Sequence, residues 1–336
     1  MVFALVVVTL VVITRWRHGQ FDWRLFASTL LGVRWPWLLT ASAFALLTYY
    51  GRALRWAVMI RHLKPRPSLW GLLSATAIGF AAIVVLGRPG ELVRPYMISV
   101  KEKLPLSTQL AAWLLERICD LLSALLIFGL ALMQVDRSGA RVGPRLQWAL
   151  EAGGWIAAAV GMGSIAVVVA LRQFSEPMQR RMLDGLGFLV GRWRARAEEL
   201  LKSFVAGMEA TRNAASLWGI FLYTLLEWGL ILLCYLALLR SFPALAALRL
   251  TDVLILIGFV AFGSLVQIPG VGGGVQVVSI VVLTEIFKVP LEAASGMALV
   301  IWIVTFVVIV PIGLLLAVRE GLNWHKIREM KQSPLA

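Results

Sequence analysis

Gly87-Arg88-Pro89-Gly90-Glu91-Leu92-Val93-Arg94 interrupts a chain made mainly of long apolar runs, and Glu116-Arg117-Ile118-Cys119-Asp120 opens the next run. Five ionisable side chains, at positions 91, 94, 116, 117 and 120, therefore fall where the chain should cross a membrane or fold back inside one. A charge at bilayer depth costs about 2.5–3.5 kcal/mol on insertion scales. Such residues usually mark something polar that passes or binds, which points to a transporter-like membrane protein.

The composition indicates an integral membrane protein of the all-α polytopic class. The 336 residues are 60% hydrophobic and 15% charged, with a mean hydropathy of +0.84, whereas soluble domains are about 45–50% apolar and 25% charged. Helices satisfy their own backbone groups in lipid, and nothing here has the alternation of a barrel. We expect about seven to nine transmembrane helices, from seven long apolar runs and two short ones: 35–60, 68–86, 107–133, 148–171, 216–239, 252–268 and 294–318, with 2–14 and 275–287.

We expect a single membrane domain over residues 1–318, followed by a short polar tail over 319–336. The polar insert 172–215 carries apolar residues at three- and four-residue steps with arginines between them, which predicts an amphipathic helix on the membrane surface. It is either a linker resting on headgroups or a regulatory or docking element. The positive-inside rule places this insert in the cytoplasm, and the predicted location is the bacterial cytoplasmic (inner) membrane, with several crossings.

Each half of the chain contains a glycine- and proline-rich break between apolar runs. The second break reads Gln267-Ile268-Pro269-Gly270-Val271-Gly272-Gly273-Gly274-Val275-Gln276. Paired breaks at corresponding places point to a binding site in transporters built from repeats. We therefore expect two interrupted, re-entrant segments and an inverted repeat, on the layout alone.

The first break has the chemistry of an anion site. Arg88 and Arg94 can grip phosphate through their planar guanidinium groups, and Glu91 could pair with Arg94 one turn later. Alternatively, the loop lies at the interface and its arginines reach to headgroups.

On a helix, Glu116, Arg117 and Asp120 converge on adjoining faces. They form either a self-neutralising cluster that fixes helix packing or part of a functional site, and we favour the second. Glu116 and Arg117 are predicted to partner the loop of Glu91 and Arg94.

The second break offers exposed backbone amides and a helix that starts near Val275, whose N-terminus would suit an anion such as a lipid phosphate. An equally good alternative is a tight hairpin that needs small residues for packing. The candidate substrate-binding residues here are Pro269, Gly270, Gly272, Gly273 and Gln276.

Three further residues are secondary candidates. Arg52 and Arg55 share a helix face beside Trp56, and anchoring at the membrane interface is the favoured role, although headgroup contact is compatible with it. Glu227 is a lone carboxylate in an apolar run, and it is either a proton site or a hydrogen-bonding partner of a neighbouring helix.

No catalytic residue, metal site or cofactor is predicted. The histidines at 18, 62 and 325 lack metal-ligand spacing, and no hydrolase or metalloprotease motif is present. The net charge of +14 is spread over many loops, so nucleic-acid binding is a poor explanation for it. Membrane lipids are the expected partners, and the oligomeric state stays open.

The chain resembles the flippase-like transmembrane region of lysylphosphatidylglycerol synthases, over about residues 35–318. That family typically has an Arg-x-Gly-Glu-x-x-Arg loop, a Glu-Arg-x-x-Asp helix and a late Pro-Gly-Gly segment. The three motifs correspond here to residues 88–94, 116–120 and 269–273. Gln276 departs from the pattern, because an acidic residue often follows the glycine segment, so the resemblance does not extend to ion coupling there.

The resemblance implies a lipid flippase-like transporter that moves an anionic, aminoacylated or glycosylated lipid between leaflets. The lipid could be a phospholipid, a polyprenyl-linked sugar or a hopanoid. In this interpretation Arg88, Arg94 and Arg117 hold the headgroup, while Glu91, Glu116 and Asp120 position them or bind a cationic substituent. Lysyl transfer is not expected, since only the tail follows the last run. The alternatives are an enzyme acting on a lipid-linked sugar or phosphate, and a non-catalytic membrane subunit.

Overall fold

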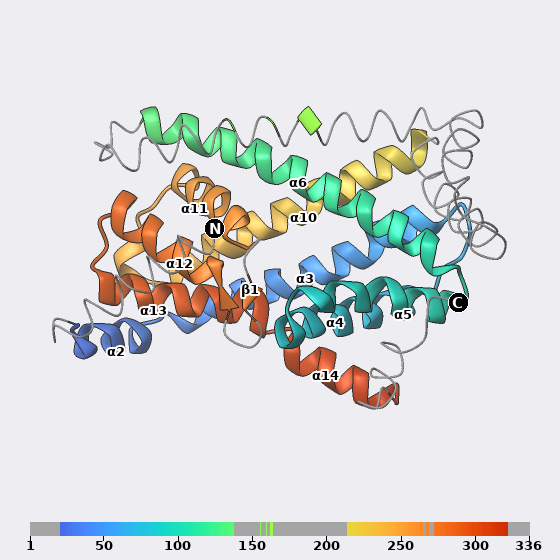
Figure 1. Cartoon of the computed structure of the whole chain (residues 1–336). Helices are drawn as coiled ribbons and strands as arrows, with labels where there is room; N and C mark the ends of the chain where they lie inside the picture. Colours follow the sequence, from blue (N-terminus) through green and yellow to red (C-terminus); the bar gives the residue numbers. More distant parts are fainter. Residues whose placement is uncertain are drawn as a thin grey trace, which may run out of the picture.

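The computed structural model describes residues 21–137, 155, 159, 162–163, 214–264, 267–268 and 272–321. The short run 2–14, nearly all of the run 148–171 and of the insert 172–215, and most of the tail lie outside these residues. Within them the structure is helical apart from one two-stranded ladder of two residues per strand (Figure 1). The described chain therefore has the all-α polytopic membrane architecture that its composition predicts.

The first half of the described chain contains five α-helices and one 3₁₀ turn: α2 (Trp23–Leu31), α3 (Trp35–Ile60), α4 (Leu69–Leu86), η1 (Arg88–Leu92), α5 (Val93–Glu102) and α6 (Leu106–Arg137).

The second half is interrupted more often, by a 3₁₀ turn (η3), by the two short strands and by two π-helical turns (η4 and η5). Its elements are α10 (Ala214–Ser241), η3 (Pro243–Leu245), α11 (Leu250–Gly263), β1 (Gln267–Ile268), β2 (Gly272–Gly273), α12 (Gly274–Val281), η4 (Val282–Ile286), α13 (Leu291–Trp302), η5 (Ile303–Val307) and α14 (Val310–Arg319).

Three helical stretches of the described residues are long and apolar enough to cross a membrane: Leu69–Leu86, Ala215–Ser241 and Leu291–Arg319. A fourth is added if α2 and α3, which meet at a 75° bend, form one span. The helix α6 has 32 residues, about 48 Å at 1.5 Å per residue, and carries charges within its apolar sequence. The total of seven to nine crossings stays a prediction, because two of the expected runs lie largely outside the described residues.

Both predicted breaks are hairpin turns between helices that pack on each other. Gly87 ends α4 with φ 72°, a backbone conformation that glycine adopts without steric cost, and α5 then returns along α4. In the second half, β1 and β2 turn the chain between α11 and α12, with Gln267 opposite Gly273 and Ile268 opposite Gly272.

Gly90 is required for close packing. A Cβ added there would lie 2.4 Å from the carbonyl oxygen of Ala82 in α4, and one at Gly79 would lie 2.5 Å from the Cβ of Arg94. Real Cβ atoms do not approach this closely, so both glycines let the returning segment lie directly against α4. The position of Arg94 depends on this contact.

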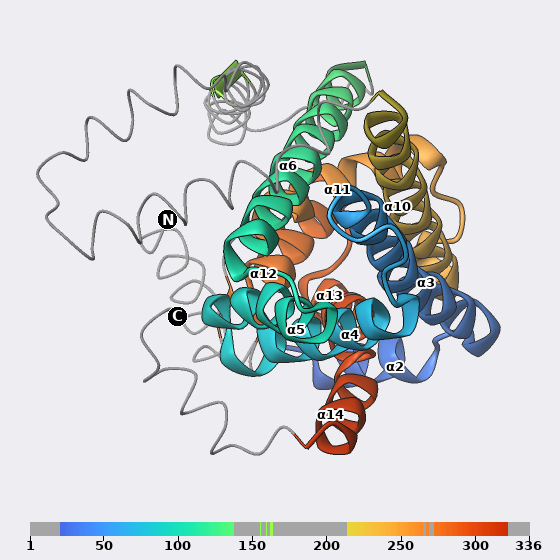
Figure 2. The ribbon, with the colours of Figure 1, turned by 90° about the vertical axis from the view of Figure 1, so that its right-hand side faces the viewer.

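The two halves repeat one order of elements, namely a long helix, a helical hairpin and a further long segment. The long helices α3 and α10 pack against each other, α6 lies on the hairpin helix α11 of the other half, and α14 lies on α4 (Figures 1 and 2). This reciprocal packing is what an internal repeat predicts. The hydrophobic core has two main clusters. One lies in α3, α4, α5 and α6 with Ile220 of α10, and the other lies in α10, α11, α12 and α13 with Ala41 and Ala45 of α3.

The outer face of α10 is suited to contact lipid. Its large apolar side chains Trp218, Phe221, Leu222 and Leu225 are exposed, whereas Glu227 and Leu238 are buried. Apolar residues therefore face outward and a charge faces inward, the reverse of the arrangement in a soluble helix.

Candidate functional site

Seven charged side chains from four helices meet in the interior, between the two halves. We call them the charged cluster: Arg52 and Arg55 from α3, Arg94 from α5, Glu116, Arg117 and Asp120 from α6, and Glu227 from α10.

Arg55 is the centre of the cluster. Its side chain is 0% exposed, and its guanidinium nitrogens lie 2.7 Å from Glu116, 2.8 Å from Asp120 and 3.1 Å from Glu227. It also donates to the hydroxyl of Thr224 at 3.1 Å. Burial with three carboxylates rules out the interfacial anchor that the sequence favoured for Arg55, which instead joins α3, α6 and α10.

Arg94 is held just as firmly, from the other side of Glu116. Its Nη1 donates to both carboxylate oxygens of Glu116, at 2.8 and 3.0 Å, and its Nε donates to Thr76 at 3.1 Å. The guanidinium also donates to the backbone carbonyl of Arg52 and lies 4.3 Å from the ring centroid of Trp56. The predicted contact between Glu116 and the first break is thus confirmed through Arg94. Trp56 is buried as part of that contact and is not an interface anchor.

Glu227 is not the lone carboxylate that its sequence surroundings suggested. Its Oε1 lies 2.5 Å from Arg52 Nη2, and its Oε2 lies 3.1 Å from Arg55 Nη2. Ionic pairing with α3 therefore explains why a carboxylate is kept in this apolar helix. Arg52 also reaches Asp120 at 3.4 Å and lies over the ring of Phe80, so it too is part of the interior.

Arg117 and Asp120 lie at the accessible edge of the cluster. Arg117 Nη2 is 3.0 Å from Asp120 Oδ2, and its side chain is 37% exposed, compared with 1% for Glu116. Arg117 approaches Glu116 only to 3.9 Å. The predicted pairing with the loop of Glu91 and Arg94 is therefore made by Glu116, and Arg117 pairs with Asp120 instead.

The rest of the first break lies nearer the surface. Glu91 pairs with Arg88 at 2.5 Å, so the expected pairing of Glu91 with Arg94 is wrong. Arg88 also donates to the carbonyl of Ser264 at 3.5 Å, close to the second break. Arg88 therefore links the first break to the end of α11.

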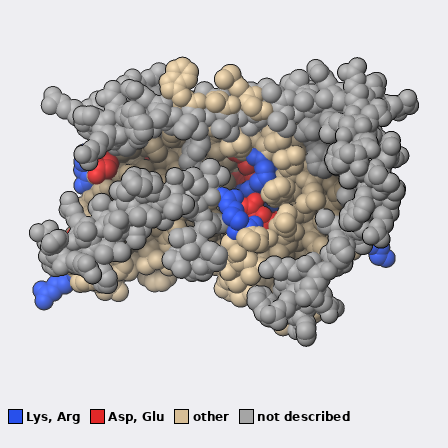
Figure 3. All heavy atoms as spheres, viewed as in Figure 1, with Lys and Arg blue, Asp and Glu red and all other residues tan. Residues whose placement is uncertain are grey.

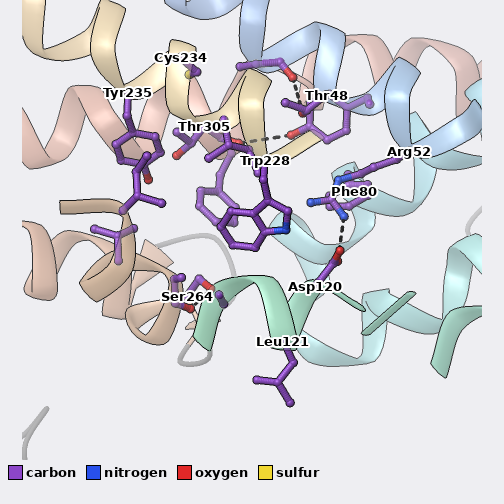
Figure 4. A pocket seen from close by; sticks show the side chains of 18 of the residues that line it. Thr48, Arg52, Phe80, Asp120, Leu121, Trp228, Cys234, Tyr235, Ser264 and Thr305 are labelled. Carbon is purple, nitrogen blue, oxygen red and sulfur yellow. Dashed lines mark hydrogen bonds and ion pairs between the residues drawn. The ribbon is translucent and has the colours of Figure 1, made fainter. Parts of the chain in front are cut away.

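A cavity of about 370 Å³ opens beside the cluster. Figure 3 shows a hollow in the middle of one face, with basic and acidic atoms inside it. Its charged lining residues all come from the first half: Arg52, Arg88, Arg117 and Asp120. The second half contributes a largely apolar and aromatic wall: Trp228, Ile231, Cys234, Tyr235, Ile257, Val260, Ala261, Ser264, Thr305 and Phe306 (Figure 4).

The cavity is therefore charged at one end and mostly apolar at the other. In Figure 4, Arg52, Phe80 and Asp120 lie at one side, and Cys234 and Tyr235 lie at the other. The hydroxyl of Tyr49 donates to the Thr305 carbonyl at 3.3 Å within η5. Such a cavity can hold a molecule with a polar, ionic part and a hydrocarbon part.

Other predicted residues lie elsewhere or outside the described residues. Arg94 and Glu116 support the cavity from behind and do not line it, and neither Gly273 nor Gln276 is among the described lining residues. Gln276 Oε1 accepts from the Gly273 amide at 2.5 Å and so holds the start of α12. Pro269 and Gly270 lie outside the described residues.

Trp228 and the two tyrosines of the cavity wall were not among the residues singled out in the sequence. They sit in apolar helices, where aromatic residues ordinarily belong to the core. The one available signal was the position of Trp228 directly after Glu227, which places both on the inward side of α10.

The sequence comparisons agree with this description. The family described as the lysylphosphatidylglycerol synthase TM region matches residues 1–313. The chain belongs to this family of membrane domains, which is linked to lipid-related processes, and it is an integral membrane protein. Searches of curated proteins and of solved structures each returned no match.

Proposed function

We propose that this chain is a lipid flippase-like transporter that moves a membrane lipid between leaflets. The observation that supports this most directly is the cavity among membrane helices, which is lined by three arginines of the first half and by an aromatic and aliphatic wall of the second half. A headgroup that crosses about 30 Å of hydrocarbon needs a polar route, and a cavity of this kind supplies a stage of that route.

The residues that stabilise the charged cluster are different from most of those that can contact a ligand in the cavity. Arg55, Arg94 and Glu116 are buried and hold one another, while Arg52, Arg88 and Arg117 line the cavity. Arginine suits such a site because its planar group binds phosphate through two parallel hydrogen bonds. In this proposal the lining arginines bind the headgroup, and the apolar wall shelters the adjoining part of the lipid chains.

The proposed transport leaves the lipid covalently unchanged. Every carboxylate of the charged cluster is engaged by at least two arginines, so none of them is free to act on a bound lipid as a general acid or base. The proposed location is the bacterial cytoplasmic membrane, with a phospholipid, polyprenyl lipid or hopanoid as the lipid.

Reconstitution in liposomes tests the proposal. Fluorescently labelled lipids are placed in both leaflets, and a membrane-impermeant quencher is added outside. Transport is expected to expose inner-leaflet label to the quencher. Arg117→Ala should slow this exchange at least about tenfold, which corresponds to an increase of about 1.4 kcal/mol or more in the activation free energy. Arg61→Ala is the matched control, because Arg61 is exposed and does not line the cavity.

Two results of the liposome assay would contradict the proposal. If liposomes with the chain quench no further than empty ones for any labelled lipid, the proposal is wrong. If Arg117→Ala and Arg61→Ala behave alike, exchange does not use this cavity.

A further inference from the structure

Acidic groups at the cavity are already neutralised by arginines. Asp120 is the one acidic residue among the described lining residues, and it contacts Arg55 at 2.8 Å, Arg117 at 3.0 Å and Arg52 at 3.4 Å. Behind it, Glu116 is held by Arg55 and Arg94. A cationic group entering this cavity would have to displace an arginine to find a carboxylate.

The cluster carries an excess positive charge. It contains four arginines (Arg52, Arg55, Arg94 and Arg117) against three carboxylates (Glu116, Asp120 and Glu227), so 4 − 3 leaves one positive charge, while Arg88 and Glu91 neutralise each other. Covering this charge with a ligand that does not compensate it would be costly, because the ligand removes it from water. One negative charge on a ligand would complete the balance.

Two lining residues also have buried donors without a hydrogen-bond acceptor among the described residues. They are the Nε of Arg117 and the indole Nε1 of Trp228. Figure 4 shows the Trp228 nitrogen on the side of its ring that faces Arg52 and Asp120. Buried donors are normally satisfied, so a ligand here should bring acceptor oxygens to the charged end.

We propose that this cavity selects lipids whose headgroup has a single anionic phosphate and no cationic substituent, and that it excludes aminoacylated, cationic lipids. This inference rests on the proposed function, because it takes the cavity as the site where the transported headgroup binds. Phosphate oxygens meet the unfilled donors, and one negative charge matches the excess of the cluster. An added ammonium group would face Arg52, Arg88 and Arg117.

The apolar wall identifies the source of the phosphate as a lipid. Ile231, Val260 and Phe306 belong to the largely apolar wall that the second half contributes to the cavity, and a soluble phosphate ester would leave this wall without an apolar partner. A lipid places its first methylene groups there and gains from their burial.

Lipid retention tests the selectivity separately from transport. The full chain is incorporated into nanodiscs with equal amounts of phosphatidylglycerol, lysyl-phosphatidylglycerol and phosphatidylcholine, and it is then re-extracted into mild detergent. The lipids that remain bound are quantified by native mass spectrometry. Phosphatidylglycerol should be enriched about tenfold or more over the lysyl form, because a like charge is strongly disfavoured against a charged site.

Two variants sharpen this measurement. Arg117→Gln removes the excess charge and one unfilled donor, while Asp120 keeps Arg52 and Arg55 as partners, so the enrichment should fall several-fold. Arg61→Gln removes an equal charge outside the cavity, and this variant should keep the enrichment of phosphatidylglycerol over the lysyl form. Equal retention of both lipids, preference for the lysyl form, or the same loss in both variants would overturn the inference.

A competition arm separates lipid from soluble phosphate. Excess glycerol phosphate should leave the bound phosphatidylglycerol in place, and its displacement at low concentration would mean that the site serves a soluble ester. If selective retention is found but leaflet exchange is absent, the proposed transport fails and the charge selectivity stands. If leaflet exchange is found but lipids are retained without selectivity, the proposed transport stands and the charge selectivity fails.

Discussion

At the scale of single residues, the charged cluster is organised around two buried arginines. Arg55 and Arg94 each meet Glu116, and each also has a hydroxyl partner, Thr224 and Thr76 respectively. Several ionic and hydrogen-bonding partners make buried ions tolerable in a protein interior, and removing one carboxylate leaves a buried positive charge with less compensation. We therefore expect the cluster to tolerate a change at its accessible edge far better than a change at its centre.

Glu116→Gln should destabilise the folded chain by about 3–5 kcal/mol, because Arg94 loses its one ionic partner and Arg55 loses one of three. Thermal unfolding in detergent measures the change. Glu91→Gln is the control, since Arg88 is 46% exposed and partly solvated pairs contribute about 0–1 kcal/mol. Equal melting temperatures for the two variants would show that Glu116 does not organise the cluster.

The sequence predicted part of this cluster for a physical reason. Ionisable residues inside apolar runs must find partners, so a meeting of Glu116 with the first break could be expected. Spacing along one helix gave no information about partners on another, and Arg55 and Glu227 are separated by about half of the chain. Trp56 was misinterpreted for a related reason, because an aromatic residue near a helix end has the same local pattern at an interface and in a core.

At the scale of elements, the hairpin of α4 and α5 holds Arg94 in place through glycine contacts. Gly79 and Gly90 allow the returning backbone to touch α4, and Gly87 supplies the turn conformation. The sequence located this break correctly from its glycines and proline. It did not show that Gly90 serves close approach, because the composition of a turn does not reveal which atoms lie opposite it.

Gly90→Ala should separate η1 from α4 and lower the melting temperature, since the added Cβ would lie 2.4 Å from a backbone oxygen and overpacking typically costs about 1–3 kcal/mol. The matched control is Gly129→Ala in α6, where an added Cβ meets nothing within 4 Å. That change should be neutral or stabilising by about 0.5–1 kcal/mol, because alanine favours helix. The reverse order of stabilities would refute the packing role of Gly90.

At the scale of the whole molecule, each half packs its last long segment on the hairpin of the other. The helix α6 lies on α11, and α14 lies on α4, where Gly313 approaches the Ala77 carbonyl closely. Neither half can bury these faces by itself. The layout of paired breaks predicted a repeat, but the exchange of segments between halves had no sequence signal, because it depends on long-range packing.

The two halves, expressed as separate chains of residues 1–171 and 172–336, should therefore associate in the membrane. A tag on one half should recover the untagged other half from detergent extracts. Gly313→Leu should reduce this recovery, since the larger side chain would force α14 from α4, whereas Gly129→Leu should not. Full recovery with Gly313→Leu would mean that the contact of α14 with α4 contributes little to assembly.

The contact of Glu227 with Arg52 and Arg55 sets a condition on any motion of this protein. Glu227 belongs to α10, whereas both arginines belong to α3, so a sliding of these helices past each other would stretch the contact directly. Rocking about an axis near the contact would keep it closed while the far end of the cavity widens. The contact of Glu227 with α3 therefore favours rocking over sliding for any motion of these two helices.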